Sequence, residues 1–496
     1  MEEKKRQEGY AHIIKYTGLF GGVQGLNILV ALVRNKLVAL LLGPTGVGLL
    51  SLFNSTIRFM SDSTNLGLGM SSVKHISEAF AKGDQHAVSQ SISTIRAWSL
   101  ITGCAGMLLC AALSPLLSKY TFGWGQHTLH FLLLSPVVGM TAVTSGEAAI
   151  LKGTRRLAGL ARISVYNVLA ALVLSVPLFV WWGDKAIVLS IFLVAFAQMV
   201  VTIAYSFSLY PPRLKVNTKV LGRGKNMIRL GIAFLFAGMF GSGADFVIRS
   251  YLNNTGSPNM LGLFNAGYMI VMTYAGMVFS AMETDYFPRL SAISHVGPQL
   301  NDTVNKQIEV SLIIIAPMLV ALVIGLPVII PLLYSKAFTP VVPMAQTAAL
   351  ALYLRAVKLP VAYLPLARGD SSSYLLMESL YDVVLVLLSV VCYNIWGLSG
   401  MGWAILFTAL FDFILLTTYM HYHYSYKLSA GVIRVALCQM PLGVAAYALT
   451  WCSHGWGYWL LGTALGIVSL AFSIFELHQR THLWQTLKNK IAMRKD

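Results

Sequence analysis

Apolar runs separated by short polar turns follow one another along the whole chain. Many of these runs exceed about 18 residues, which is long enough for a helix to cross a hydrocarbon core of roughly 30 Å. The pattern therefore predicts an all-α polytopic membrane protein. It places about fourteen transmembrane helices, near residues 14–42, 46–73, 94–118, 128–151, 161–182, 186–208, 228–251, 260–284, 308–334, 341–366, 373–395, 399–421, 431–452 and 456–477.

Composition strengthens this prediction. Of the 496 residues 56% are hydrophobic and only 11% are charged, whereas about 25% of the residues of a soluble domain are charged. The five cysteines lie in apolar runs without paired spacing, so we expect no disulfide framework, no metal site and no cofactor. The first apolar stretch is too long for the core of a signal peptide, so we expect the first span to be retained.

The distribution of Lys and Arg predicts the orientation. With the N-terminus inside, the cytoplasmic segments hold most of the 36 basic residues, and the outer segments hold only Lys119, Lys185 and Lys336. Cytoplasmic loops carry such an excess, so both termini are expected in the cytoplasm. The net charge of +17 then follows from topology and from attraction to anionic lipid, and no nucleic-acid partner is needed to explain it.

The longest basic connection suggests how the chain is divided. We expect an N-terminal lobe of six spans (1–209), a cytoplasmic linker (210–229), a second six-span lobe (230–425), two extra spans (426–477) and a basic, amphipathic tail (478–496). The segments 46–54 (GVGLLSLFN) and 257–265 (SPNMLGLFN) are similar, which favours two repeated halves. Secondary transporters often follow this plan and bind their substrate between the repeats.

Six basic residues remain inside the apolar spans. A cation at mid-bilayer costs several kcal/mol, so it usually faces the interior of a bundle or a wet cavity. The arginine guanidinium also binds phosphate oxygens in a bidentate manner. We therefore expect a cavity for a solute that carries phosphate or carboxylate. The candidate ligands of this anion are Arg34, Arg58, Arg249, Lys36, Arg355 and Lys358.

Two of these cations have acidic neighbours at helical spacing. Arg58 with Asp62, and Asp245 with Arg249, are i,i+4 pairs, so each pair shares one face of a helix. Either the carboxylate only neutralises the cation in a structural ion pair, or the cation lines the cavity and the carboxylate tunes its charge.

The other four cations have no such neighbour. Arg34 and Lys36 are two residues apart and cannot share a face, so we expect Arg34 to face the cavity. Arg355 and Lys358 do share a face, close to prolines that we expect to interrupt their helix. Their role is either structural or functional.

Acidic residues inside the spans are candidates for ion coupling. Glu378 and Asp382 are i,i+4, so repulsion on one face favours a shared proton, unless Glu378 lies at the membrane interface. Asp412 is isolated near mid-span, and Glu147 is a further candidate. His421 and His423 are more typical of an interfacial aromatic belt than of a metal site. No phosphate-binding loop, HExxH or GxSxG motif is present, so we expect no enzymatic activity.

Three ordered blocks, 35–60 with 67–81, 286–294 (YFPRLSAIS) and 337–369, resemble Wzx-type O-antigen and polysaccharide flippases of the PST family, in the MOP exporter superfamily. The resemblance covers roughly residues 14 to 420. It implies a V-shaped, alternating-access bundle that moves an undecaprenyl-pyrophosphate-linked oligosaccharide from the inner to the outer leaflet of the bacterial inner membrane. It also implies that Arg34, Arg58 and Arg249 meet the pyrophosphate. Many members of the family stop at twelve spans, whereas this chain is expected to have two more, within residues 431–477.

Two rival functions stay open at this stage. A cation-coupled multidrug exporter of the same superfamily would favour net acid in the cavity, against which the arginines argue. A polysaccharide polymerase or ligase would need reactive groups on a large outer loop, and the outer loops here are short. The sequence also leaves open which glycan is carried and whether other polysaccharide assembly proteins bind.

Overall fold

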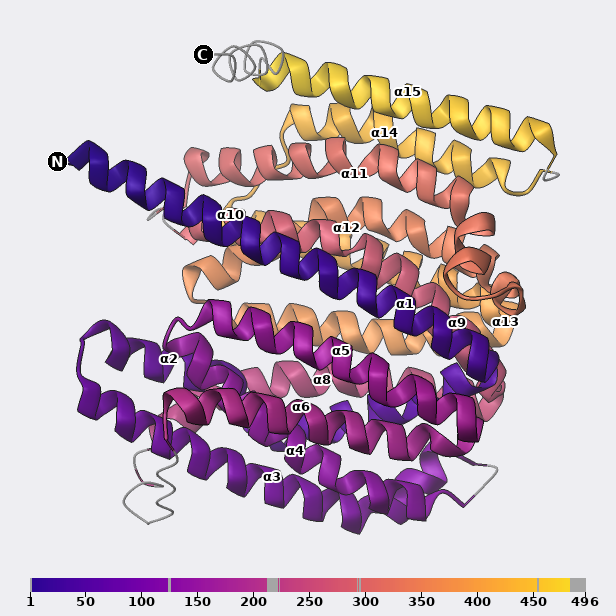
Figure 1. Ribbon diagram of the computed structural model, residues 1–496. Coiled ribbons are helices and arrows are strands. Elements are labelled where there is room, and N and C mark those ends of the chain that lie inside the picture. The colour runs from indigo at the N-terminus through magenta and orange to yellow at the C-terminus, as the bar shows by residue number, and fades with distance from the viewer. Residues whose placement is uncertain are drawn as a thin grey trace, which may run out of the picture. The chain divides into compact units, whose positions relative to one another are not determined.

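The computed structural model describes residues 2–123, 126–211, 222, 224–291, 293, 296–452 and 455–481, and all regular structure in these segments is helical (Figure 1). The α-helices are α1 (Glu2–Thr64), α2 (Leu68–Ala81), α3 (Gln85–Thr121), α4 (Thr128–Gly153), α5 (Leu157–Trp182), α6 (Ile187–Leu209), α8 (Lys225–Thr255), α9 (Pro258–Tyr268), α10 (Met277–Ser291), α11 (Pro298–Leu333), α12 (Val342–Arg368), α13 (Ser371–Tyr424), α14 (Ala430–Leu449) and α15 (Trp456–Thr481). Short 3-10 turns, η1 (Gly183–Ala186) and η3 (Lys336–Val341), and a π-helical turn, η2 (Met269–Ala275), connect some of them.

The helices group into two compact units. Unit 1 comprises residues 1–262 with 333–335, and unit 2 comprises residues 263–332 with 336–496. The linker expected at 210–229 falls within the range of unit 1, and residues 212–221 and 223 lie outside the described residues. The division into two six-helix lobes therefore stays a prediction, as does the amphipathic tail, because residues 482–496 also lie outside the described part.

Ten helical stretches in the described residues are long and apolar enough to cross a membrane, so the chain is a multi-pass membrane protein. Three of them, with 40, 52 and 54 residues, are much longer than one crossing requires. Each of these contains a glycine with positive φ: Gly43 (62°), Gly183 (54°) and Gly397 (57°). L side chains rarely adopt this backbone conformation, and all three glycines lie where the hydropathy pattern placed turns. The count of fourteen spans remains a prediction.

Two expectations about where helices are interrupted were wrong. The span placed at 46–73 is broken, because α1 ends at Thr64 and the chain turns through Leu66 and Gly67, both with positive φ. A Cβ at Gly67 would overlap the backbone of Gly231, so close packing against α8 accompanies this turn. The prolines at 360 and 365 also do not interrupt their helix, since α12 continues through them to Arg368.

Polar groups at helix ends and beside prolines find partners. Asp84 caps α3 by accepting from the backbone N–H groups of His86 and Ala87, at 2.9 and 3.0 Å. Within α11, Pro327 lacks an N–H for the carbonyl of Val323, and Gln346 Nε2 of α12 donates to that oxygen at 3.0 Å. The hydrogen bond from Gln346 is buried among apolar helices, where no water is available to replace it.

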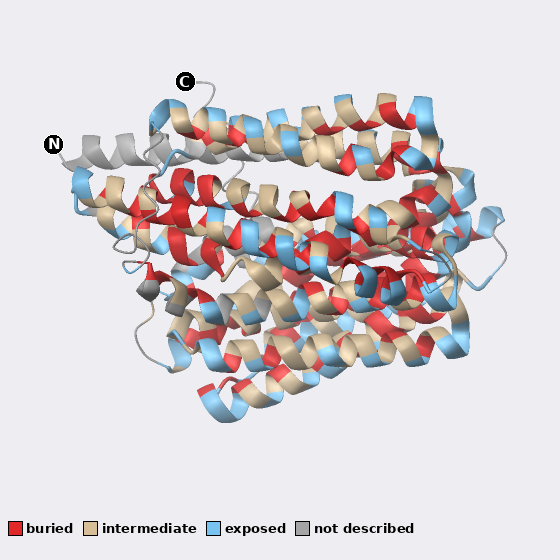
Figure 2. Ribbon diagram, turned by 90° about the horizontal axis from the view of Figure 1, so that it is seen from below, coloured by how far each residue is buried: buried red, intermediate tan, exposed pale blue. Residues whose placement is uncertain are grey.

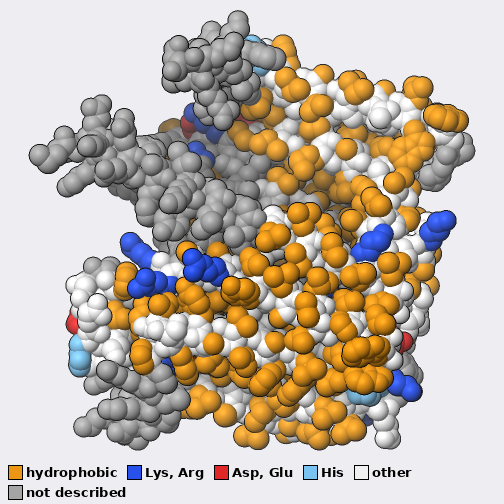
Figure 3. Space-filling view, viewed as in Figure 1, with side chains coloured by type: hydrophobic (Ala, Val, Ile, Leu, Met, Phe, Trp, Pro, Cys, Tyr) orange, Lys and Arg blue, Asp and Glu red, His pale blue; other side chains and the backbone are white. Residues whose placement is uncertain are grey.

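The outer surface is apolar. Large hydrophobic side chains are exposed on the outward faces of the helices, including Leu108, Val173 and Leu437, which are 65%, 65% and 69% exposed. Figure 2 shows the buried residues along the inward sides of the helices, and Figure 3 shows apolar side chains over most of the visible described surface, with Lys and Arg in a few places near helix ends. Such a surface is suited to lipid.

The two similar segments found in the sequence pack against each other in unit 1. Pro44 and Pro258 each begin a helical run, and a glycine follows each proline four residues later, at Gly48 and Gly262. A Cβ at Gly48 would overlap the carbonyl oxygen of Pro258, and a Cβ at Gly262 would overlap that of Pro44. The contact is thus reciprocal, and only glycine fits at Gly48 and at Gly262.

We expect Gly262→Val to destabilise the protein by about 1–3 kcal/mol, because the added side chain must displace the α1 backbone rather than a flexible side chain. Thermal unfolding of the purified chain in lipid nanodiscs would measure the change. Gly457→Ala is the matched control, since a Cβ there meets nothing within 4 Å. Equal midpoints for Gly262→Val and the wild type would contradict the close contact.

Candidate functional site

Unit 1 contains a polar pocket of about 470 Å³ among α1, α4, α5 and α6. It brings together three of the residues that the sequence singled out, Arg34, Arg58 and Asp62. The other polar side chains of its lining are neutral amides and hydroxyls: Asn54, Ser61, Asn65, Thr141, Ser145, Ser190 and Gln198. Two cations against one carboxylate leave this pocket with a positive formal charge.

The two arginines of this pocket are held differently. Arg34 Nε donates to Ser175 Oγ at 3.2 Å, so the guanidinium is anchored to α5. Arg58 Nε lies 3.7 Å from Asp62 Oδ2, and the Arg58 side chain is 72% exposed whereas Asp62 is 28% exposed. Ser242 of α8, whose hydroxyl donates to the carbonyl of Gly238 at 2.7 Å, also lies close to Asp62. The i,i+4 pair therefore forms, but it is loose and leaves most of the Arg58 side chain accessible to a ligand.

Lys36 and Arg249 are placed elsewhere. Lys36 is half-buried and does not line this pocket in the described structure. It is two residues from Arg34, so the two side chains lie on different faces of the helix. Arg249 of α8 is buried and forms an ion pair with Asp245, and neither residue lines the polar pocket of unit 1. Whether these cations meet a substrate stays a prediction.

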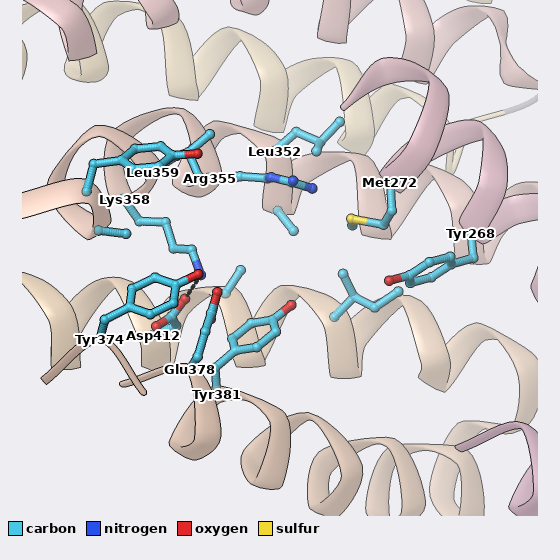
Figure 4. Close-up of a pocket in the computed structure, with 15 residues that line it drawn as sticks. Tyr268, Met272, Leu352, Arg355, Lys358, Leu359, Tyr374, Glu378, Tyr381 and Asp412 are labelled. Atoms are coloured by element: carbon cyan, nitrogen blue, oxygen red, sulfur yellow. Dashed lines mark hydrogen bonds and ion pairs between the residues drawn. The ribbon is translucent and has the colours of Figure 1, made fainter. Parts of the chain in front are cut away.

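Unit 2 contains a second pocket, of about 370 Å³, among α9, η2, α12 and α13 (Figure 4). Its lining includes Arg355, Lys358, Glu378 and Asp412 from the sequence-based set. The Arg355 guanidinium lies 5.5 Å from the centroid of the Phe279 ring. Two cations and two carboxylates leave this pocket without a net formal charge.

Asp412 is not isolated, contrary to the expectation from sequence. It is buried and forms an ion pair with Lys358 of α12, whose Nζ also lies 4.4 Å from the centroid of the Tyr381 ring. Asp382 is not among the lining residues of this pocket but lies within electrostatic reach of Glu378, Lys358 and Asp412. The structure thus gathers three of the proposed ion-coupling carboxylates, Glu378, Asp382 and Asp412, into one cluster in unit 2, while their role remains a prediction.

One buried ion pair was missed from the sequence. Arg96 is not one of the six cations that the sequence analysis placed in the apolar spans, but it lies inside α3, where Nε and Nη2 donate to the two oxygens of Glu147 at 2.7 and 3.1 Å. Both side chains are 4% exposed. Ser206 Oγ of α6 also donates to Glu147, at 2.5 Å, and Arg96 Nη2 donates to the carbonyl of Tyr210 at 3.0 Å. Glu147 thus links α3, α4 and α6, and both of its carboxylate oxygens accept hydrogen bonds in these contacts.

The histidines near the end of α13 belong to a polar cluster. His423 Nε2 lies 3.7 Å from Asp370 Oδ2, and Asp370 caps α13. Hydrogen bonds from the Ser373 hydroxyl and backbone N–H hold the pKa of the Asp370 carboxyl well below its usual range, and hydrogen bonds from Ser372 and Tyr424 make smaller contributions. In the described residues no group of three or more His, Cys, Asp and Glu side chains has the arrangement of a metal site.

Comparison with known proteins identifies the family of this chain. A family model described as "Polysaccharide biosynthesis protein" matches residues 37–343. No curated protein matches the sequence.

Several solved structures share the fold. The lipid II flippase MurJ in an inward closed conformation is 13% identical with a TM-score of 0.70, and the match covers 93% of this chain and 99% of that one. An inward-facing multidrug resistance MATE family transporter of the MOP superfamily is 15% identical with a TM-score of 0.63, covering 83% and 95%. A MOP superfamily transporter from Pyrococcus furiosus Vc1 is 14% identical with a TM-score of 0.57, covering 86% and 96%. The fold is therefore that of MOP superfamily transporters.

We expect Arg96→Met to lower stability by about 3–5 kcal/mol, because Glu147 would be left as a buried carboxylate without its cation. Thermal unfolding in nanodiscs would measure the loss. Arg96→Met combined with Glu147→Leu should recover much of it. Lys306→Gln is the control, since Lys306 pairs with Asp302 at the surface and should change stability by only about 0–1 kcal/mol. An Arg96 variant as stable as the Lys306 variant would refute the structural role.

Proposed function

The chain belongs to the family of polysaccharide biosynthesis proteins, and from this premise we propose that it is a flippase for a lipid-linked oligosaccharide. The cargo would be an undecaprenyl-pyrophosphate-linked O-antigen or related repeat unit, moved from the inner to the outer leaflet of the bacterial inner membrane. We place both termini in the cytoplasm. The MurJ neighbour, a lipid II flippase, lends support through its fold.

The pocket of unit 1 is the observation that carries this proposal. Arg34 and Arg58 line one cavity with a single carboxylate, Asp62, and most of the Arg58 side chain is exposed. Guanidinium groups bind phosphate oxygens through parallel charge-assisted hydrogen bonds, and the surrounding amides and hydroxyls suit the hydroxyl groups of a sugar. The arrangement supports binding of a pyrophosphate with its first sugar.

We propose that transport follows alternating access. Solved MATE transporters that share the fold are described in inward-facing and outward-facing conformations. A movement of this kind would expose the pyrophosphate ligands first to one side of the membrane and then to the other. The polyprenyl tail would stay in lipid throughout.

A cation-coupled drug exporter is the second candidate. The carboxylates Glu378, Asp382 and Asp412 in unit 2 favour it, because they could bind a cation. Against it, Lys358 already pairs with Asp412, and the pocket of unit 1 is positive. A polymerase or ligase is disfavoured because the connections between the described helices on the outer side are short.

Arg34→Gln and Arg58→Gln should each reduce surface glycan assembly about 10- to 100-fold, because a hydrogen bond to a charged group contributes about 1.5–3 kcal/mol. Arg249→Gln tests whether the third arginine takes part. Complementation of flippase-null bacterial strains that make different glycans, read as surface polysaccharide, would measure the effect and identify the accepted glycan.

Membrane insertion of each variant must be checked by immunoblotting of membrane fractions. Arg58→Lys should retain part of the activity, since it keeps the charge, and Lys306→Gln should retain all of it. Normal glycan in strains carrying Arg34→Gln or Arg58→Gln would remove the pyrophosphate-binding role of the unit 1 pocket.

A further inference from the structure

The pocket of unit 2 has a different charge from the pocket of unit 1. Arg355 and Lys358 face two lining carboxylates, and Lys358 is already paired with Asp412. Asp382 is not part of the lining and interacts electrostatically with Glu378, Lys358 and Asp412. A phosphate group would therefore gain no net Coulomb attraction here, whereas it would gain some in unit 1. The pocket is also a poor site for a metal cation, because the Asp412 carboxylate is already paired with Lys358.

Tyrosines give the unit 2 pocket its second property. Four of them, Tyr268, Tyr363, Tyr374 and Tyr381, belong to its lining, and they come from three different helices. Figure 4 shows Tyr374, Glu378 and Tyr381 extending from α13 toward α12, with Tyr268 at the right of the view. Tyrosine combines a flat apolar ring with a hydroxyl that donates and accepts hydrogen bonds.

An uncommon backbone feature shapes one wall of this pocket. The π-helical turn Met269–Ala275 begins directly after Tyr268 and places Met272 in the lining. π-Helical turns are rare and occur frequently at functional sites. Gly276 follows the turn, and the nearest side-chain atom to a Cβ built there is Arg355 Nη1, at 3.5 Å. The end of the π-helical turn therefore lies against the Arg355 side chain.

We propose that the unit 2 pocket is a binding subsite for an uncharged sugar ring of the transported glycan. A sugar ring has apolar C–H faces that fit against tyrosine rings, and hydroxyl groups that pair with Tyr, Glu and Arg side chains. The volume of about 370 Å³ lies at the lower end of the roughly 300–1,000 Å³ range of small-molecule pockets. The inference rests on the proposed flippase function and assigns the neutral part of the cargo to unit 2.

Saturation-transfer difference NMR with the full-length protein in lipid nanodiscs tests this assignment. The probes are free glucose, galactose, mannose, N-acetylglucosamine and N-acetylgalactosamine, with glucuronate as the charged counterpart of glucose. We expect transfer from at least one neutral sugar and no preference for glucuronate over glucose, because the pocket is balanced in charge. Tyr268→Leu and Tyr374→Leu should each reduce the binding of that sugar about fivefold, through loss of the ring.

Matched variants separate the ring from general damage to the fold. Tyr268→Phe should keep binding within about twofold, because it keeps the ring. Tyr166→Leu should change nothing, since Tyr166 is 57% exposed and lies on α5 of unit 1. Absence of transfer from every neutral sugar, a clear preference for glucuronate, or unchanged binding in both leucine variants would each overturn the proposal. Sugar binding that is lost in Arg58→Gln but kept in the tyrosine variants would move the subsite to unit 1 and overturn it as well.

Isothermal titration with inorganic pyrophosphate distinguishes this proposal from the proposed function. Loss of pyrophosphate binding in Arg34→Gln and Arg58→Gln, with sugar binding intact, supports two separate subsites. Sugar binding without any pyrophosphate binding by the wild type would count against the pyrophosphate-linked cargo and leave the sugar subsite standing. Binding of the lipophilic cation tetraphenylphosphonium in place of sugars, weakened by Tyr374→Leu, would overturn the sugar assignment in favour of a cation exporter.

Discussion

A charge enclosed by apolar helices must be neutralised or must contact a polar cavity, and this constraint separates the charges of this protein into two kinds. Arg96 with Glu147, and Lys358 with Asp412, are ion pairs formed between helices, with nearly complete burial of the carboxylates. Such pairs are costly to break from one side only, so they hold neighbouring helices in register. Arg58 is held only loosely and stays mostly exposed within a pocket. The exposed cation is the one that a ligand can reach.

The helical pattern could be predicted because lipid imposes it locally. A crossing needs about 20 apolar residues, and a glycine with positive φ marks each of the turns at residues 43, 183 and 397. The break at Leu66 and Gly67 was not predicted, since it accompanies close packing of that turn against Gly231, which sequence spacing does not reveal. Gly67 and Gly231 are far apart in sequence, and neither has room for a side chain because the two segments pack together.

Ion pairs could be predicted only where both partners lie on one helix. The pairs Arg58 with Asp62 and Asp245 with Arg249 followed from i,i+4 spacing, and both form. The partner of Asp412 could not be predicted, because 54 residues separate it from Lys358 and nothing in either sequence segment says which helices are neighbours. Periodicity assigns a residue to a face of its own helix, and only the tertiary packing decides what that face meets.

Two pockets of unlike chemistry are what a cargo with unlike parts requires. The proposed cargo has an anionic group, a neutral glycan and an apolar tail, and removing the tail from lipid would cost about 0.8 kcal/mol for every CH₂ group. A protein that leaves the tail in the bilayer needs polar pockets for the other two parts alone. Transport also requires release, so a loosely paired arginine and a charge-balanced pocket lined with tyrosine are better suited to a passing substrate than a deep cluster of cations would be. Moderate attraction at separate subsites lets one part of the cargo be released while another is still held, so that no single step has to break all the contacts at once.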